Sequence, residues 1–330
     1  MVNGLNGGVG DLGMALGNGD RGGRSLRTIA VVGDVHDQWL PVDGELLGVL
    51  EVDAALFVGD FGNESLEVVR AIAGLKLPKA VVMGNHDAWY TATPWGQKKA
   101  PYDRATEDRV QLQLDAFGDD HVGYGVKEFA ALGISVVGGR PFSWGGPKWQ
   151  NQGFYEQRFG VKDLEESTAQ ISQCAVECDH SAVVFVAHNG PYGLGSEPES
   201  ICGKDWRPLG GDFGDRDLTA AIKATRDAGK TVPLVTFGHM HHKLRHTQDR
   251  LRDRVIVDKA GTVYLNAAVV PRIEKSKGTT RHSFMLVTLD GDIVVRILRV
   301  AVTADGEIVE EERLFQRLDP AIRQAAAIAP

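Results

Sequence analysis

The chain has 330 residues, of which 43% are hydrophobic, and its formal net charge is -8 at pH 7. This length and apolar content are sufficient for one large α/β domain or two ordinary ones. The acidic balance argues against broad contact with nucleic-acid polymers, because that contact normally depends on clustered Lys and Arg. A small anionic substrate is still compatible with this charge if the site supplies its own positive field.

The N-terminal segment, residues 1–24, is rich in Gly and Asn and has no basic or continuous apolar stretch of signal-peptide length. We expect it to be a disordered leader. It is not typical of a phosphate loop, since no strand precedes it and no Gly-Lys-Ser/Thr follows. No later window has the apolar length of a membrane span. The three cysteines are too few and too unevenly spaced for a disulfide framework, so we expect a cytoplasmic protein with reduced thiols.

From residue 28 onward, short β-branched runs alternate with segments of helical spacing. The runs are continuously apolar, which is typical of strands buried on both faces. The predicted strands are 28–32, 54–58, 80–83, 134–137, 182–187, 233–237 and 263–266. The predicted helices are 64–75, about 103–117 and 163–178. This alternation indicates a layered α/β architecture.

The C-terminal part departs from this alternation. A strand pair is predicted at 283–289 and 293–300, around an Asp-Gly-Asp turn, and it favours two packed sheets as readily as one parallel sheet. Residues 303–330 are predicted to be a tail or a peripheral helix, so the domain is expected to span 25–302. Three segments rich in Gly, Pro and aromatic residues interrupt the pattern, and loops of this length are usually functional or disordered. These segments are 88–102, 140–159 and 192–217.

Five of the apolar runs are followed, within a residue or two, by side chains that bind metals. If the strands run in the same sense, these groups meet at one sheet edge, where α/β proteins tend to bind ligands. Each motif alone has an ordinary explanation as a turn or a satisfied histidine. The ordered set, however, indicates a metal site. The motifs are Asp34-x-His36, Gly59-Asp60, Gly84-Asn85-His86-Asp87, His188 and Gly238-His239-x-His241.

In these motifs the sequence resembles the calcineurin-like metallophosphoesterase superfamily, over about residues 28–270. The resemblance implies an α/β fold, a four-layer αββα sandwich, with a two-metal centre at the carboxyl ends of the strands. It also implies that a metal-bridging hydroxide attacks phosphorus in line. Matched by position, it assigns Asp34, His36 and His241 to the first metal, Asn85, His188 and His239 to the second, Asp60 to both, and His86 to the substrate phosphate.

The donor set narrows the choice of metal. Mixed imidazole and oxygen ligands suit borderline ions, and we expect two divalent ions, manganese first and iron, zinc or cobalt as alternatives. The charge of two such ions exceeds that of Asp34, Asp60 and a bridging hydroxide together. An acidic protein would thereby create a local site for anions.

Two positions depart from the family pattern. Many members have an Asp three residues after the bridging aspartate, where this chain has Asn63. An amide oxygen stabilises an imidazolium less than a carboxylate does, so we expect either a lowered pKa for His86 or charge support from Asp87, Glu64 or Asp37. Asp37 is itself the second departure, because Gly often follows Asp-x-His. We take His86 and Asp87 as the catalytic candidates.

The motif variants bear on the substrate. Gly-Asp-Phe-Gly-Asn-Glu and Gly-Asn-His-Asp resemble the bacterial-type branch that acts on small phosphoesters or nucleotides, rather than the protein phosphatases. Arg140 follows a predicted strand and is a candidate to bind a phosphate bidentately, although an ordinary surface arginine fits the pattern equally well. Aromatic side chains in the long loops could stack on a base if they line the cleft, and packing of the loops is the alternative. These are Trp95, Trp144, Trp149, Tyr155 and Trp206.

The sequence therefore predicts an enzyme that hydrolyses a small phosphorylated substrate. A non-catalytic metal-binding scaffold of the same fold is one alternative, but the loss of catalysis would be expected to erode the ligand set, which is intact here. A phosphodiesterase or nuclease is another, and the net charge argues against a polymeric substrate.

Overall fold

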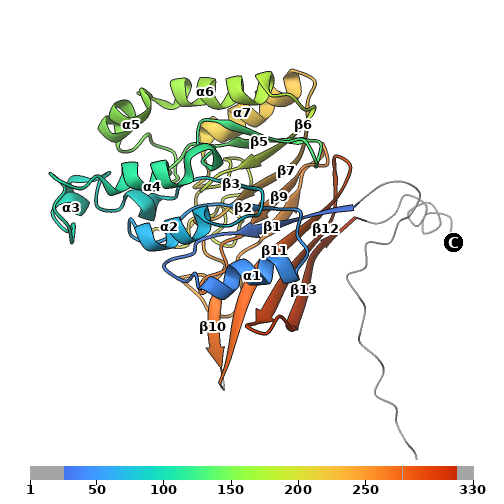
Figure 1. Ribbon diagram of the computed structural model, residues 1–330. Coiled ribbons are helices and arrows are strands. Elements are labelled where there is room, and N and C mark those ends of the chain that lie inside the picture. Colours follow the sequence, from blue (N-terminus) through green and yellow to red (C-terminus); the bar gives the residue numbers. More distant parts are fainter. Residues whose placement is uncertain (1–25, 277, 318–330) are drawn as a thin grey trace, which may run out of the picture.

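The computed structural model describes residues 26–276 and 278–317, and two β-sheets with helices on their outer faces form the body of the molecule (Figure 1). The predicted leader at 1–24 lies outside the described residues. Among the described residues, no helix has the length and apolar character needed to cross a membrane. The helices are α1 (Pro41–Val49), α2 (Leu66–Ala73), α3 (Pro94–Gln97), α4 (Arg109–Phe117), α5 (Gln152–Phe159), α6 (Leu164–Glu177) and α7 (Arg216–Asp227).

The first sheet has the strand order β13-β12-β11-β1-β2-β3, with β10 paired to β11. Strands β1, β2 and β3 are parallel, whereas β11 runs antiparallel to β1 and continues as an antiparallel ladder with β12 and β13. The bounds are β1 (Leu26–Val32), β2 (Ala54–Phe57), β3 (Lys79–Val81), β10 (Ile273–Ser276), β11 (Thr279–Asp290), β12 (Ile293–Thr303) and β13 (Ile308–Gln316).

The second sheet has the order β4-β5-β6-β7-β9-β8. Strands β5, β6, β7 and β9 are parallel, and the two edge strands are antiparallel to their neighbours. The bounds are β4 (Val126–Phe129), β5 (Ile134–Gly138), β6 (Ala182–Val186), β7 (Thr231–Phe237), β8 (Val255–Val257) and β9 (Val263–Asn266).

Three hydrophobic cores separate four layers. Alternate residues of a strand point to opposite faces, so in β1 the side chains of Ile29 and Val31 face the second sheet while Ala30 and Val32 face helices α1 and α2. The third core lies between the second sheet and helices α6 and α7, where Phe185 packs with Ile171 and Leu218. The predicted four-layer αββα sandwich is confirmed.

The strands predicted from apolar runs are all present, and α2, α4 and α6 lie within the predicted helices. The terminal hairpin is also confirmed as β11 and β12. Part of the segment predicted to be a tail or helix is instead a strand, because β13 pairs with β12 and extends the first sheet to Gln316. Residues 318–330 lie outside the described residues. Sequence patterns did not predict α1, α7 or the short strands β4, β8 and β10.

Candidate metal centre

The predicted ligands follow β1, β2, β3, β6 and β7, whose carboxyl ends meet at one edge of the sandwich. Four of these residues have a positive φ, which side chains other than glycine rarely adopt: 46° at Asp34, 45° at His36, 55° at Asp60 and 66° at His239. Such a conformation costs about 1–3 kcal/mol per residue and persists where the surrounding structure enforces it, commonly at functional sites. The strain here turns the ligand side chains toward a common centre.

The first group of ligands comprises Asp34, His36 and His241, with one potential ligand atom from each lying within 4.8 Å of the others. The Nε2 atoms of His36 and His241 are 3.2 Å apart. The carboxylate of Asp34 accepts the backbone N–H of His239 at 3.0 Å, which links the loop after β1 to the loop after β7. The structure therefore brings together the three residues that the sequence assigned to one ion.

The second group comprises Asp60, His188 and His239, again within 4.8 Å. The Nε2 atom of His188 lies 3.2 Å from Nδ1 of His239 and 3.0 Å from Oδ1 of Asn85. The other nitrogen of His188, Nδ1, donates to the carbonyl oxygen of Val58 at 2.7 Å. This hydrogen bond leaves Nε2 with a lone pair toward the centre, as in metal-binding histidines.

Asp60 lies between the two groups. Its Oδ2 is 3.8 Å from Nε2 of His36, and its Oδ1 is 3.4 Å from Nε2 of His188. Burial raises the pKa of Asp60, but the charges of His188, His86 and neighbouring imidazoles outweigh this and lower it to about 2. One carboxylate oxygen directed to each group is the arrangement that a bridging ligand requires.

The site is rich in donors and poor in cationic side chains. Asp34 and Asp60 are 1% and 2% exposed, and within 26–276 and 278–317 neither lies within salt-bridge distance of a Lys or Arg. Burial, followed by the charge of Asp60, raises the pKa of Asp34 well above its usual range. Burial also lowers the pKa of His241, to about 4. Because buried carboxylates are unfavourable without a compensating charge, this donor set fits divalent metal ions.

His86 lies at the rim of this centre, with its ring 4.8 Å from that of His36. Its Nδ1 donates to the amide oxygen of Asn63 at 2.6 Å. Burial, its largest influence, lowers the pKa of His86, while the charges of Asp60 and Asp37 raise it. Asn63 thus contacts the imidazole, as the sequence led us to expect, but the lowered pKa follows from burial and not from Asn63.

Asp87 does not face His86. Its carboxylate is fully buried and accepts the backbone N–H groups of Asp60, Phe61 and Gly84 at 2.7–2.9 Å. Glu64, another candidate for charge support, accepts the backbone N–H of Tyr90. The geometry therefore gives no support to a catalytic role for Asp87, whose visible function is to hold the loops after β2 and β3 together.

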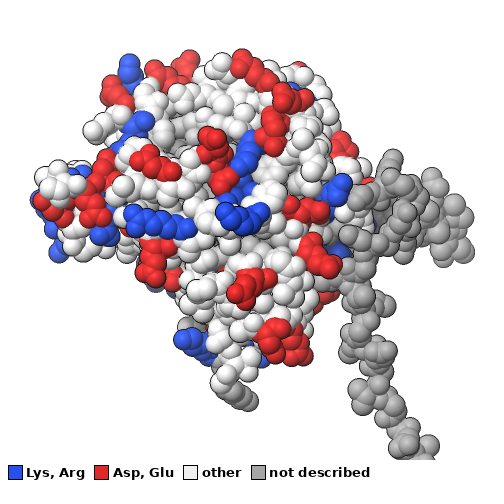
Figure 2. All heavy atoms as spheres, viewed as in Figure 1, with Lys and Arg blue, Asp and Glu red and all other residues white. Residues whose placement is uncertain are grey.

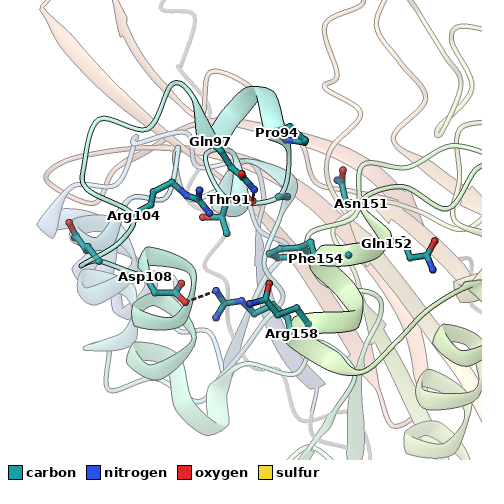
Figure 3. A pocket seen from close by; sticks show the side chains of 13 residues that line it. Thr91, Pro94, Gln97, Arg104, Asp108, Asn151, Gln152, Phe154 and Arg158 are labelled. Atoms are coloured by element: carbon teal, nitrogen blue, oxygen red, sulfur yellow. Dashed lines mark hydrogen bonds and ion pairs between the residues drawn. The ribbon is translucent and has the colours of Figure 1, made fainter.

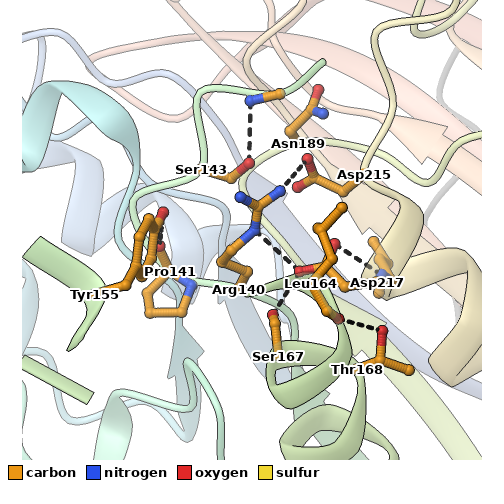
Figure 4. Close-up of polar contacts among 12 residues, drawn as sticks. Arg140, Pro141, Ser143, Tyr155, Leu164, Ser167, Thr168, Asn189, Asp215 and Asp217 are labelled. Carbon is orange, nitrogen blue, oxygen red and sulfur yellow. Dashed lines mark hydrogen bonds and ion pairs between the residues drawn. The ribbon is translucent and has the colours of Figure 1, made fainter. Parts of the chain in front are cut away.

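Arg140 lies outside the site, contrary to the expectation that it binds phosphate. Its side chain is 3% exposed and forms ion pairs with Asp215 at 2.7 Å and Asp217 at 3.0 Å (Figure 4). Nor is it a surface arginine, since its guanidinium packs over the ring of Trp149 at 4.9 Å. Arg140 joins the end of β5 to the start of α7, a helix that the sequence patterns did not predict.

A cavity of about 390 Å³ opens above the centre, and we call it the histidine cavity. All three long loops contribute to it: Trp89 comes from 88–102, Trp144 from 140–159, and Trp206 and Phe213 from 192–217. By contrast, Tyr155 is buried elsewhere and Trp95 is 59% exposed. The other residues that line the histidine cavity are Asp60, Asn85, His86, Gln150, Asp205, His239, Met240, His241, Lys243, Arg245 and Arg252.

A second and larger cavity, of about 610 Å³, lies beside α5, and we call it the α5 cavity (Figure 3). Gln97 and Arg104 line one side, Phe154 and Arg158 the other, and Nη2 of Arg158 is 2.5 Å from Oδ2 of Asp108. Within the part of the chain that the structure describes, every group of potential metal ligands lies at the histidine cavity and none lies at the α5 cavity.

A model of the calcineurin-like phosphoesterase family matches residues 27–243. That range includes every predicted ligand, from Asp34 to His241. No curated protein sequence matches the chain.

The solved structures that are similar to this chain differ widely from it in sequence. One crystal structure is 12% identical, with a TM-score of 0.50, and the match covers 88% of this chain and 100% of that one. A dimetal phosphatase from Danio rerio is 14% identical, with coverages of 88% and 99% and a TM-score of 0.45. A purple acid phosphatase from yellow lupin (Lupinus luteus) seeds is 12% identical, with coverages of 88% and 54% and a TM-score of 0.46. At 12% identity, the first likeness concerns the fold alone.

Proposed function

Because the chain belongs to the calcineurin-like phosphoesterase family, we propose that it is a metal-dependent hydrolase of phosphoric esters that acts on a small phosphoester or a nucleotide. The observation that carries this proposal is the position of Asp60, with one oxygen toward each of two imidazole groups. Such a pair of adjoining sites is what phosphoryl transfer by two metal ions needs.

We assign the ligands as the sequence suggested. One ion would bind Asp34, His36 and His241, the other would bind Asn85, His188 and His239, and Asp60 would bind both. Manganese is the proposed ion, since mixed nitrogen and oxygen donors suit borderline metals. When bound, the two ions would lower the pKa of a water molecule and neutralise charge on the phosphoryl oxygens, in support of an in-line attack on phosphorus.

The residues of the chain would orient the substrate and move a proton. Nδ1 of His86 is occupied by Asn63, so Nε2 is the nitrogen left to interact with the phosphoryl group or the leaving oxygen. Trp89 stacks on the His86 ring at 4.5 Å and 13° between planes, which fixes the plane of the imidazole. Asp87 would act indirectly, since it holds the backbone of Asp60.

A polymeric substrate is less compatible with the acidic balance of the protein, whose formal net charge is -8. On the face drawn in Figure 2, Lys and Arg are interspersed with Asp and Glu and do not form a broad basic track. Nucleic-acid polymers normally need such a track. The remaining alternative, a metal-binding scaffold without turnover, makes a different prediction for the assay below.

The test is phosphate release from p-nitrophenyl phosphate, bis(p-nitrophenyl) phosphate and a nucleotide panel, with protein loaded with Mn²⁺. We expect turnover by the wild type and a loss of about 10³-fold in kcat with Asp60→Asn, because the bridging charge is removed. Asp249→Asn, a surface change on a loop, is the matched control and should keep the wild-type rate. Metal binding without turnover on the whole panel would favour the scaffold.

His86 is tested separately from the metals. We expect His86→Ala to lower kcat by about 10²-fold or more while the metal content stays at the wild-type level, since general acid catalysis is worth this much. His180→Ala is the control, because that ring pairs with Glu128 away from the cavity. Wild-type kcat in His86→Ala would remove His86 from the mechanism.

A further inference from the structure

Two groups of aromatic rings line the histidine cavity. In the first, Trp89 stacks between His86 and Trp144, with ring centroids 4.5 Å and 5.5 Å away and planes within 16° of parallel. In the second, Trp206 and Phe213 meet edge to face at 4.8 Å. Both rings of this second pair come from loop 192–217 and are only half buried. An inorganic phosphate group alone would make no stacking contact with these half-buried rings, so they favour a substrate with a ring of its own.

An arginine lies over the second aromatic pair. The guanidinium of Arg245 is 5.5 Å from the centroid of the Trp206 ring. Asp205, which directly precedes Trp206, accepts the backbone N–H of Arg245 at 2.9 Å and pairs with Arg252 at 3.3 Å. Among the described residues, no carboxylate lies within salt-bridge distance of the Arg245 guanidinium.

Arg245 shares this cavity with the candidate metal centre. Both Arg245 and Trp206 line it together with the candidate ligand His241. The cavity thus holds the ligand cluster and, apart from it, the free guanidinium of Arg245 over the Trp206 ring. The other exposed cation of the lining, Lys243, is 3.5 Å from Glu274, so its charge is partly balanced.

The size of the cavity sets the scale of the occupant. About 390 Å³ falls within the range of sites that enclose a ligand of nucleotide size. An aromatic base can stack on Trp206 and Phe213, and an unpaired guanidinium binds phosphate oxygens in a fork geometry. These three features of one cavity match a phosphoryl group at the ligand cluster, a second phosphate at Arg245 and a base at Trp206.

We propose that the substrate is a nucleotide that carries a second phosphate besides the one removed, with Arg245 and Trp206 as its specificity-determining residues. This inference rests on the proposed function, since the removed phosphate must lie at the ligand cluster. In the reaction, a water oxygen forms a bond to phosphorus as the bond from phosphorus to the leaving oxygen breaks. The leaving oxygen takes a proton, and orthophosphate and the shortened nucleotide are released.

The experiment compares kcat/KM for five probes with Mn²⁺-loaded protein: adenosine 3′,5′-bisphosphate, ADP, AMP, p-nitrophenyl phosphate and glycerol 2-phosphate. The first two probes carry the second phosphate on different sites of the nucleotide and distinguish an ester from an anhydride substrate. We expect at least one of them to exceed AMP by about tenfold or more, because a charge-assisted phosphate contact adds affinity. AMP in turn should exceed glycerol 2-phosphate, which has no ring to stack.

Single substitutions test whether Arg245 and Trp206 cause this preference among the probes. Arg245→Ala should lower kcat/KM for the preferred probe by about tenfold or more, and that for AMP and glycerol 2-phosphate by less than about threefold. Arg245→Lys should recover part of the loss. Trp206→Ala should lower the values for all three adenine probes and spare glycerol 2-phosphate. Arg216→Ala is the matched control, since that exposed arginine stacks on Tyr192 outside the cavity.

Binding to metal-free protein gives a second readout. Adenosine 3′,5′-bisphosphate and ADP should quench tryptophan fluorescence, and both Arg245→Ala and Trp206→Ala should weaken this effect. If all probes lose activity equally in Arg245→Ala, or if glycerol 2-phosphate is the best substrate, the inference is overturned while the hydrolase stands. If nucleotides bind through Arg245 but no probe releases phosphate, the proposed hydrolysis fails and the ligand assignment stands.

Discussion

The two cavities of this molecule differ in a way that size does not reveal. The α5 cavity is the larger, at about 610 Å³ against about 390 Å³. Yet its charged lining residues are exposed or paired, as Arg158 is with Asp108, and its walls hold no histidine. The histidine cavity instead ends on imidazoles and on the buried carboxylates of Asp34 and Asp60, which have no Lys or Arg within salt-bridge distance among the described residues. Unbalanced buried donors, rather than volume, mark the functional site.

One matched substitution in each cavity tests most directly whether only the histidine cavity serves the reaction. We expect His241→Ala to lower kcat by about 10³-fold, because a metal ligand and its charge complement are lost. Gln157→Ala in the α5 cavity should leave kcat within about twofold of the wild type. Phosphate release with Mn²⁺ measures both variants, and equal losses in the two would mean that the α5 cavity also serves the reaction.

A second contrast lies between Arg140, which lies outside the histidine cavity, and Arg158, which lines the α5 cavity. Arg140 is buried between two carboxylates, whereas the half-buried Arg158 pairs with an exposed Asp108. Arg140→Met leaves two buried negative charges, so we expect the free energy of unfolding to fall by about 3–5 kcal/mol. Arg158→Met should cost about 0–1 kcal/mol. Urea denaturation of both variants checks this, and similar losses would contradict the assignment of Arg140 as a structural link.

A smaller effect is expected from pH. Burial lowers the pKa of His121 to about 4 in the folded protein, and its Nε2 has no hydrogen-bond partner. The unfolded chain therefore binds a proton at His121 more readily than the folded protein does. As a result, the free energy of unfolding is unaffected by His121 above pH 6.5 and decreases as the pH falls toward 4. The expected loss at pH 5 is about 1–2 kcal/mol.

Unfolding of metal-free protein at pH 7 and pH 5 measures this effect, with His121→Gln as the variant that should reduce the difference. His121 lies apart from both cavities, so the change should not depend on Mn²⁺. An unchanged pH difference in His121→Gln would assign the effect to other groups.

The sequence predicted those parts of the fold and site that depend on local patterns. Apolar runs identified the strands of the sandwich. Because the carboxyl ends of parallel strands meet at one edge of a sheet, the motifs that follow them must lie at that edge. For that reason Asp34, Asn85 and His239 are found together although they are distant in the chain. The resemblance of the motifs supplied their pairing.

The sequence was less informative where partners come from irregular segments. Arg140 looked available for phosphate because its partners, Asp215 and Asp217, lie in a stretch read as a loop. The same loop provides Trp206 and Phe213 to the cavity, and Arg245 follows the last ligand in a segment without periodicity. The positions of these residues depend on tertiary packing, which no periodic pattern in the local sequence predicts. The run Asp215-Arg216-Asp217 at the start of α7 is a local feature from which the sequence could have indicated this charge cluster.

The central claim is that this chain binds two divalent ions through Asp60 and the imidazoles around it. The most direct measurement is metal analysis of wild type and Asp60→Asn after loading with Mn²⁺ and removal of unbound ions. The account predicts two equivalents per chain in the wild type and a clear loss in Asp60→Asn, because the shared carboxylate offsets the repulsion between the ions. Fewer than about one equivalent in the wild type, or equal contents in both proteins, would contradict it.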